Sequence, residues 1–166
     1  LTRLVGSEMC IRDSHNTINN LNGFENMKRI DVDLASGLQA FEAKHFTRAM
    51  QLLSPLAEEG NLEAQHRCAI MYQNGLGNKE NPLLAFKWMK KAAESGHPLA
   101  QHGLGFMYME GDCTEQNGEL AVKWFSKAAD QGLTGSLTTL ALMYEEGKIV
   151  EKDPVKAKEY LKRAGF

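Results

Sequence analysis

The sequence predicts an all-α fold in which helical hairpins stack into a solenoid. The first observation is a 36-residue repeat in three copies, the signature of a repeat architecture. The second is that each copy holds two segments whose apolar residues recur every three or four positions, as in an amphipathic helix. One pair of such helices cannot bury its apolar face alone, so stacked neighbours must cover it. The residues that recur at this interval include Met71, Met107 and Met143, Tyr72, Tyr108 and Tyr144, Gly75, Gly111 and Gly147, and Trp88, Trp124 and Tyr160.

Composition and charge exclude several classes of protein. The 166 residues are 43% hydrophobic and 24% charged, which is typical of a globular chain with a real core. Lys and Arg number 19 against 21 Asp and Glu, a net charge of −2, so the basic excess of a nucleic-acid binder is missing. No apolar run approaches the roughly 20 residues that span a bilayer, so we expect no membrane insertion. Three scattered cysteines favour neither a disulfide framework nor a four-ligand zinc site.

Residues 1–32 are predicted to lie outside the solenoid, as a non-native or disordered segment. Residues 1–14 show neither helical nor strand periodicity and resemble translated sequencing-adapter read-through. Charged residues interrupt them, so they lack the apolar core of a secretory signal. Residues 15–31 are rich in Asn and indicate a linker, with a short helix as the alternative. We therefore expect the native N-terminus to be missing, which leaves a periplasmic and a cytoplasmic location both open.

A shorter unit, residues 33–60, is predicted to form a capping hairpin ahead of the full repeats. Its first helix, over residues 33–44, carries Leu34, Leu38 and Phe41 on one face. Its second helix, over residues 46–59, holds Ala49 and is followed by Gly60, in register with the later units. The connection between the two helices is short, as in a plain helical hairpin.

Three full units follow, at residues 62–96, 98–132 and 134–166. In the first unit a helix over residues 62–74 is predicted to end at Gly75, where a left-handed residue terminates it. Asn81 then caps the second helix, and Pro82 occupies its first position, where the missing N–H does no harm. Asn117 and Asp153 are the equivalent caps of the next two units.

The tryptophans of the second helices are the largest candidates for the core. Small residues flank them at helical spacing, so each indole can approach a neighbouring helix closely. We expect Trp88 and Trp124 to be mostly buried between helices, with Ala85 and Ala121 beneath their rings. The alternative is that one indole is an exposed binding hot spot.

These motifs resemble the Sel-one-like repeat (SLR), a relative of the tetratricopeptide repeat. The pattern AxxxLGxMYxxGxG followed by AxxWxxKAAxxG appears as AQHRCAIMYQNGLG and AFKWMKKAAESG, then as AQHGLGFMYMEGDC and AVKWFSKAADQG. A third copy is SLTTLALMYEEGKI and AKEYLKRAGF. The resemblance implies a right-handed α/α superhelix and a role in binding other proteins. The departures from the family pattern are Cys68, Ala69, Cys113, Ala141 and Ile149.

No motif predicts catalysis, a cofactor or a metal site. The sequence lacks Ser-x-x-Lys, the Gly-x-Ser-x-Gly elbow, a P-loop and GxGxxG. His66 and His102 lie 36 residues apart, and we interpret them as filling a packing position where the family often has Tyr or Phe. A metal or proton-transfer role is the alternative. Cys68 is expected in the core, and no disulfide with Cys113 is expected.

The resemblance to tetratricopeptide units also implies which residues of each first helix face a concave groove. In each full unit they lie three positions before, one position after and four positions after Ala69 or its equivalent. An apolar line with a polar border suits an amphipathic helix or an extended peptide. The alternative is that Ile70 and Phe106 only fill gaps between stacked units. The expected groove residues at these positions are His66, Ile70, Gln73, His102, Phe106, Met109, Thr138, Leu142 and Glu145, and Leu38 continues the apolar line into the capping hairpin.

The function expected from this resemblance is that of a scaffold or adaptor that binds a partner protein or peptide in the groove. We expect no enzymatic activity, no cofactor and no nucleic-acid partner. The alternatives are an auxiliary or regulatory subunit of a bacterial envelope enzyme, a repeat-type hydrolase, or a structural homo-oligomer. The oligomeric state is left open.

Overall fold

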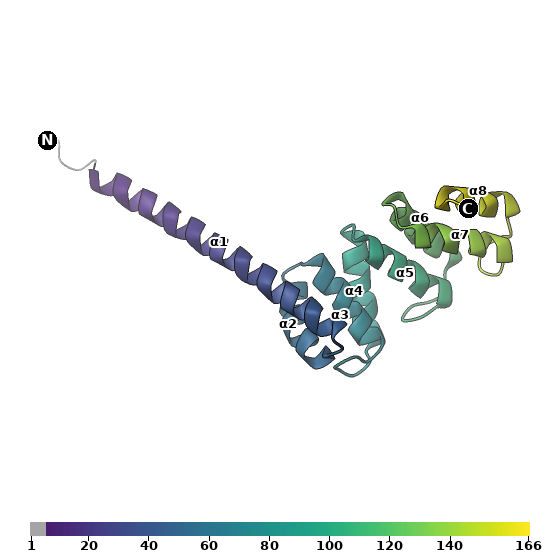
Figure 1. The fold of residues 1–166 in the computed structure, drawn as a ribbon, viewed down its shortest axis with the longest axis horizontal. Coiled ribbons are helices and arrows are strands. Elements are labelled where there is room, and N and C mark those ends of the chain that lie inside the picture. The colour runs from purple at the N-terminus through teal and green to yellow at the C-terminus, as the bar shows by residue number, and fades with distance from the viewer. Residues whose placement is uncertain (1–5) are drawn as a thin grey trace.

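The structure, a computed structural model, describes the backbone of residues 6–166 and the side chains of residues 22–166. Over these residues it has eight helices and no strand, and each helix packs mainly on the helices before and after it in the chain. The predicted all-α solenoid of helix hairpins is therefore confirmed (Figure 1). The helices are α1 (Gly6–Glu42), α2 (Phe46–Glu58), α3 (Leu62–Gln73), α4 (Pro82–Glu94), α5 (Pro98–Glu110), α6 (Gly118–Asp130), α7 (Thr134–Glu146) and α8 (Pro154–Ala164).

Helix α1 differs from the expected linker and short first helix. It runs without a break from Gly6 to Glu42 and projects from the solenoid as a single rod (Figure 1). No proline interrupts these residues, and extending a helix from a packed turn is far easier than starting one. The side chains of residues 22–29 are all exposed, and contact with the core begins at Ile30. The adapter origin expected for residues 1–14 stays a prediction, and residues 1–5 lie outside the described residues.

The helix caps follow the expected pattern. The side chain of Asn81 accepts the backbone N–H of Leu84 at 3.1 Å, and Asn117 does the same for Leu120 at 2.9 Å. These bonds satisfy donors that the first turn of a helix leaves free. Asp153 caps α8 in the same way, with the N–H groups of Val155 and Lys156 as donors. The capping prediction is confirmed in all three units.

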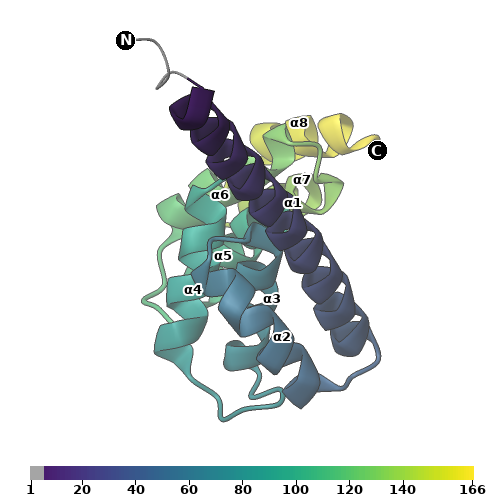
Figure 2. The ribbon, with the colours of Figure 1, turned by 90° about the vertical axis from the view of Figure 1, so that its left-hand side faces the viewer.

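The buried core runs along the stack between successive helices. Figure 2, viewed from the N-terminal side, shows the later helices in succession behind α1. Trp88 and Trp124 are only 4% and 7% exposed, which confirms that both are buried. Lys91 lies 5.2 Å from the centre of the Trp88 ring system, and Lys127 lies 4.9 Å from that of Trp124. The ammonium group of a surface lysine thus makes a cation–π contact with each buried indole.

None of the helices over the described residues is both long and apolar enough to cross a bilayer.

Candidate functional site

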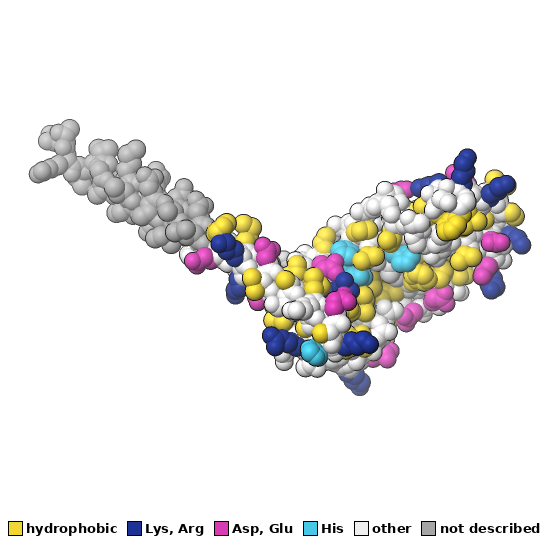
Figure 3. Space-filling view, in the orientation of Figure 1, with side chains coloured by type: hydrophobic (Ala, Val, Ile, Leu, Met, Phe, Trp, Pro, Cys, Tyr) yellow, Lys and Arg dark blue, Asp and Glu magenta, His cyan; other side chains and the backbone are white. Residues whose placement is uncertain are grey.

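The first helices of the full units, α3, α5 and α7, carry most of the expected groove residues. On the face shown in Figure 3, histidine side chains lie among hydrophobic ones in the middle of the solenoid. Acidic side chains lie along the lower edge of the same face (Figure 3). The surface therefore combines an apolar centre with a charged border.

The expected groove residues differ widely in their exposure. Phe106 is 38% exposed and Leu142 is 55% exposed, whereas Ile70 and Leu38 are half-buried and pack against the core. Gln73, His102, Met109 and Thr138 are also half-buried, Glu145 is exposed, and His66 is buried. The large apolar side chains that remain open to solvent on this line are therefore those of α5 and α7.

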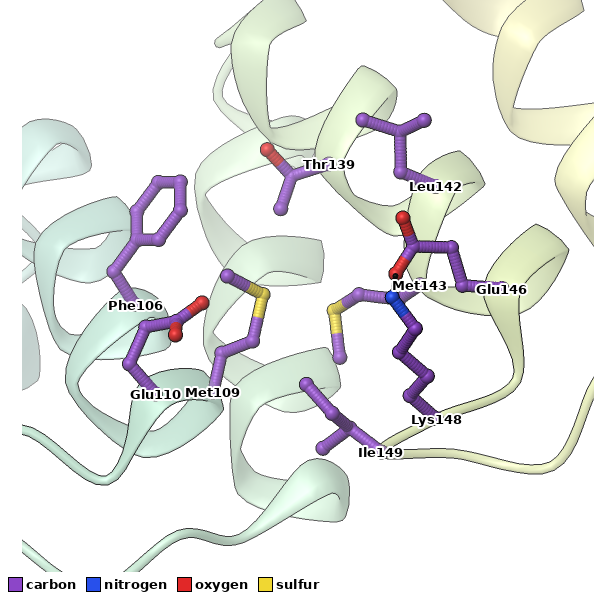
Figure 4. A pocket seen from close by; sticks show the side chains of 9 residues that line it. All are labelled: Phe106, Met109, Glu110, Thr139, Leu142, Met143, Glu146, Lys148 and Ile149. Carbon is purple, nitrogen blue, oxygen red and sulfur yellow. Dashed lines mark ion pairs between the residues drawn. The ribbon is translucent and has the colours of Figure 1, made fainter.

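A cavity of about 280 Å³ lies between α5 and α7. Phe106, Met109 and Leu142 line it together with six residues outside the expected groove set, and Met109 and Met143 extend into it from α5 and α7 (Figure 4). The other seven expected groove residues lie outside this cavity. Its additional lining residues are Glu110, Thr139, Met143, Glu146, Lys148 and Ile149.

An aromatic cluster holds Phe106 at the edge of this cavity. Its ring meets that of Phe125, from α6, edge-on at 5.1 Å and that of His102 at 4.8 Å. Phe125 is fully buried and lies against Gly105, where a Cβ atom would come within 2.8 Å of the ring. Because Gly105 has no side chain, Phe125 packs closely against α5 and contacts the ring of Phe106.

The rim of the cavity is mostly acidic. Glu110 and Glu146 lie at the C-terminal ends of α5 and α7, where the helix dipole adds negative potential. Lys148 is paired with Glu146 at 3.2 Å (Figure 4). Glu145, the residue before Glu146 in the chain, is exposed. Glu110 and Glu146 are 36 residues apart, so the repeat register already contained the signal for this acidic pair.

A second group of polar residues lies between α3 and the start of α5. Nδ1 of His97 accepts the N–H of Ala100 at 3.1 Å and so caps α5, while its Nε2 lies 2.8 Å from Oε2 of Glu63. The His66 ring lies 4.9 Å from that of His97. Ligand-type atoms of Glu63, His66 and His97 all lie within 4.8 Å of one another, so these three side chains could hold a metal ion.

The electrostatics of this group follow from burial and hydrogen bonding. Burial, with a smaller contribution from His97, lowers the pKa of His66 to about 4, so its ring is neutral at pH 7. Burial alone would raise the pKa of Glu63, but hydrogen bonds from His97 and Arg67 outweigh it, and the pKa is lowered. Burial also lowers the pKa of His102, whose Nδ1 lies 2.8 Å from Oγ of Ser136.

The two cysteines of the described residues are free thiols. Burial raises the pKa of Cys68 to about 12, and burial with the neighbouring Asp112 raises that of Cys113 to about 11. Both thiols are therefore protonated and weakly nucleophilic at pH 7. Cys68 occupies the core, as expected from its place on the apolar face.

Comparison with known proteins identifies the repeat. The family model for the Sel1 repeat matches residues 62–97, 98–133 and 137–165, more than half of the chain. A comparison with curated proteins gives no match. Among solved structures, c5321, a protective antigen of uropathogenic Escherichia coli with an SLR fold, is 32% identical with a TM-score of 0.77. A Sel1 repeat protein from Oxalobacter formigenes is 32% identical with a TM-score of 0.72.

These two structures are longer than the chain described here. The alignments cover 89% and 80% of this chain, but only 32% of the E. coli protein and 53% of the Oxalobacter protein. The chain thus spans about a third and about half of the two structures that it matches.

Proposed function

Because the chain belongs to the Sel1 repeat family, whose helical repeats typically serve as scaffolds for protein–protein interaction, we propose that it binds a peptide segment of a partner protein between α5 and α7. Family members are generally non-catalytic, and the proposal accordingly assigns the chain no catalytic step. The binding site proposed is the cavity lined by Phe106, Met109 and Leu142.

The observation that carries this proposal is the pair Phe106 and Leu142. They occupy the same position in successive units, face one cavity, and both remain open to solvent although they are large and apolar. Leaving such side chains exposed forgoes the free energy that burial would contribute, which favours a surface that a partner covers. The cavity volume is near the lower end for ligand pockets and suits one or two large apolar side chains.

The acidic rim favours a partner segment with basic residues. Glu110 and Glu146 line the cavity, and Lys148, the lysine among the lining residues, is paired with Glu146. A segment with a large apolar residue flanked by Lys or Arg would fill the cavity and place its cations beside these carboxylates. Such charge pairing chiefly raises the rate of association and selects among partners.

A peptide-display selection on the full chain tests this proposal. We expect the selected peptides to combine an apolar anchor with flanking basic residues, and to bind Leu142→Ser at least about tenfold more weakly. The melting temperature of this variant should change little, because the side chain is more than half exposed. Leu83→Ser is the matched control, since Leu83 is 82% exposed on α4 and does not line the cavity. Equal loss of binding in both variants, or a large drop in the melting temperature of Leu142→Ser, would refute the proposed site.

A further inference from the structure

The side chains of Glu63, His66 and His97 form a cluster that the peptide-binding proposal does not use. Glu63 and His66 lie one turn apart on α3, and His97 reaches them from the N-terminus of α5 in the next unit. One carboxylate and two imidazoles are a ligand set that divalent transition metals bind in proteins. From this arrangement we infer that the three side chains bind a divalent transition-metal ion such as Zn²⁺ at the junction of the first two full units.

The buried state of His66 supports a metal site independently of the clustering. His66 is only 6% exposed, yet its Nδ1 is buried without any hydrogen-bond partner. Buried polar atoms in folded proteins are nearly always paired, so an unpaired one calls for a physical reason. The ring is neutral at pH 7 and so keeps a free lone pair, which is the form of histidine that binds metals.

The separations between the ligand-type atoms are close to those that a metal ion requires. Four ligands at about 2.0–2.2 Å from a tetrahedral Zn²⁺ lie roughly 3.3 Å from one another. The ligand-type atoms here lie within 4.8 Å of one another, with Nε2 of His97 and Oε2 of Glu63 at 2.8 Å. For the three atoms to reach one ion, the longer separations must close and the short one must open. Three protein ligands leave a fourth position for water.

Metal binding would move the imidazole proton of His97 from Nε2 to Nδ1. Nδ1 accepts the N–H of Ala100, so Nε2 carries the proton and donates a hydrogen bond to Oε2 of Glu63. A metal ion on Nε2 needs the lone pair there, so the proton moves to Nδ1 and the imidazole stays neutral. The capping bond to Ala100 is then lost. The metal-bound and metal-free chains therefore differ in how α5 begins.

The charges around the cluster both attract and repel a cation. Glu63 and, farther out, Glu42 supply negative charge, while Arg67 lies on the same side with its Nε 2.8 Å from Oε1 of Glu63. By occupying Oε1, Arg67 leaves Oε2 directed to His97 and available to the ion. By holding one carboxylate oxygen, Arg67 fixes the orientation of the other oxygen toward the ion.

The next unit provides a natural comparison. His102 is the repeat equivalent of His66, but Leu99 and Leu133 replace the equivalents of Glu63 and His97. His102 instead pairs with Ser136 through Nδ1. The cluster is thus specific to one junction, although the helical scaffold around it repeats.

Titration of the full chain with ZnCl₂, followed by calorimetry, tests the site. We expect one equivalent to bind to the unaltered chain, and Co²⁺ at the same site to give the visible absorption bands of a tetrahedral complex. Glu63→Gln and His66→Phe should each weaken Zn²⁺ binding at least about tenfold, since each removes a ligand. His66→Phe keeps an aromatic ring in the buried position, and Glu63→Gln alters a half-buried side chain, so at least one variant stays folded.

His97→Asn separates the metal role of His97 from its capping role. Asparagine is a good N-cap, as Asn61 shows on α3, so this variant should keep its melting temperature without metal and lose the increase that Zn²⁺ produces. His45→Asn, at an exposed position outside the cluster, is the matched control and should bind Zn²⁺ as the unaltered chain does. Equal Zn²⁺ affinity in the unaltered chain, Glu63→Gln and His66→Phe would overturn the inference, as would no binding up to millimolar Zn²⁺.

Discussion

Glu63 and His97 lie 34 residues apart in the sequence, and a hydrogen bond of 2.8 Å joins their side chains. His102 and Ser136 are separated by the same 34 residues and are joined at the same distance. In both pairs the first residue belongs to the first helix of one unit, and the second lies at the start of the first helix in the next. A 36-residue repeat thus brings residues 34 apart into contact across a junction, and polar pairs there link successive units.

Acidification is expected to destabilise the chain through His66. The pKa of its buried ring is lowered to about 4, whereas the unfolded chain has the ordinary value of 6.5. Between these two pH values the unfolded chain binds more protons than the folded chain at His66. The contribution of neutral His66 to the stability of the folded chain is therefore full above pH 6.5 and is lost as the pH falls toward 4. The loss is on the order of 3 kcal/mol, at 1.36 kcal/mol per pKa unit.

Urea unfolding of the unaltered chain and of His66→Phe at pH 7 and pH 4 measures this loss. The difference in unfolding free energy between the two pH values should shrink in the variant, whereas His45→Asn, at an exposed position, should match the unaltered chain. An unchanged pH dependence in His66→Phe would show that other groups carry the acid sensitivity.

Trp88→Ala is expected to destabilise the chain by about 3–5 kcal/mol, because it empties a large buried site between helices. Trp124→Ala should have an effect of the same size. Leu83→Ala, on the same helix as Trp88 but 82% exposed, should stay within about 0.5 kcal/mol of the unaltered chain. Chemical denaturation measures all three, and a loss below about 1 kcal/mol for Trp88→Ala would contradict its place in the core.

Gly77→Ala is expected to cost more than Gly96→Ala. Both glycines have a left-handed backbone, with φ of +71° and +96°, so any side chain strains them. A Cβ at Gly77 would in addition overlap the backbone of Phe46 and Thr47, whereas a Cβ at Gly96 meets nothing within 4 Å. Melting temperatures of the two variants compare these effects directly. Equal melting temperatures would mean that the loop after α3 moves freely away from α2.

Removal of residues 1–29 is expected to leave the melting temperature within about two degrees of that of the full chain. The side chains of residues 22–29 are exposed, and contact with the solenoid begins at Ile30 and Leu34. Thermal unfolding followed by circular dichroism gives the comparison. A drop of many degrees would show that α1 stabilises the stack well beyond its first packed turn.

Short-range sequence patterns predicted much of the fold, because helix caps and the spacing of apolar residues along a helix depend on residues that are close together in the chain. Asn81, Asn117 and Asp153 cap the helices that they were expected to cap, and Trp88 is buried as its flanking alanines suggested. The start of α1 was missed, since asparagines weaken a helix without ending it and no proline marks a boundary. Composition therefore indicated a linker where the structure has helix.

The candidate sites were predicted less completely, because they depend on contacts between units. The resemblance to tetratricopeptide units singled out Phe106 and Leu142, but Lys148 and Ile149 reach the cavity from a loop whose path no periodicity describes. The cluster around His97 was missed for a related reason. Its members come from two units, and His66 alone carries no sign that Glu63 and His97 lie beside it.

Because its main interfaces join helices that follow one another in the chain, the solenoid can behave as an elastic element. The main interfaces between the described helices join helices that follow one another in the chain, so the span between the two ends is the accumulated result of rotations at each successive junction. Small rotations at the interfaces between hairpins can change the curvature of the whole by small increments while the core between them stays buried. A ligand wedged between α5 and α7 would fix one of those rotations and stiffen the stack at that point. Its occupancy would then be transmitted as a change in the separation of the two ends, without the unfolding of any unit.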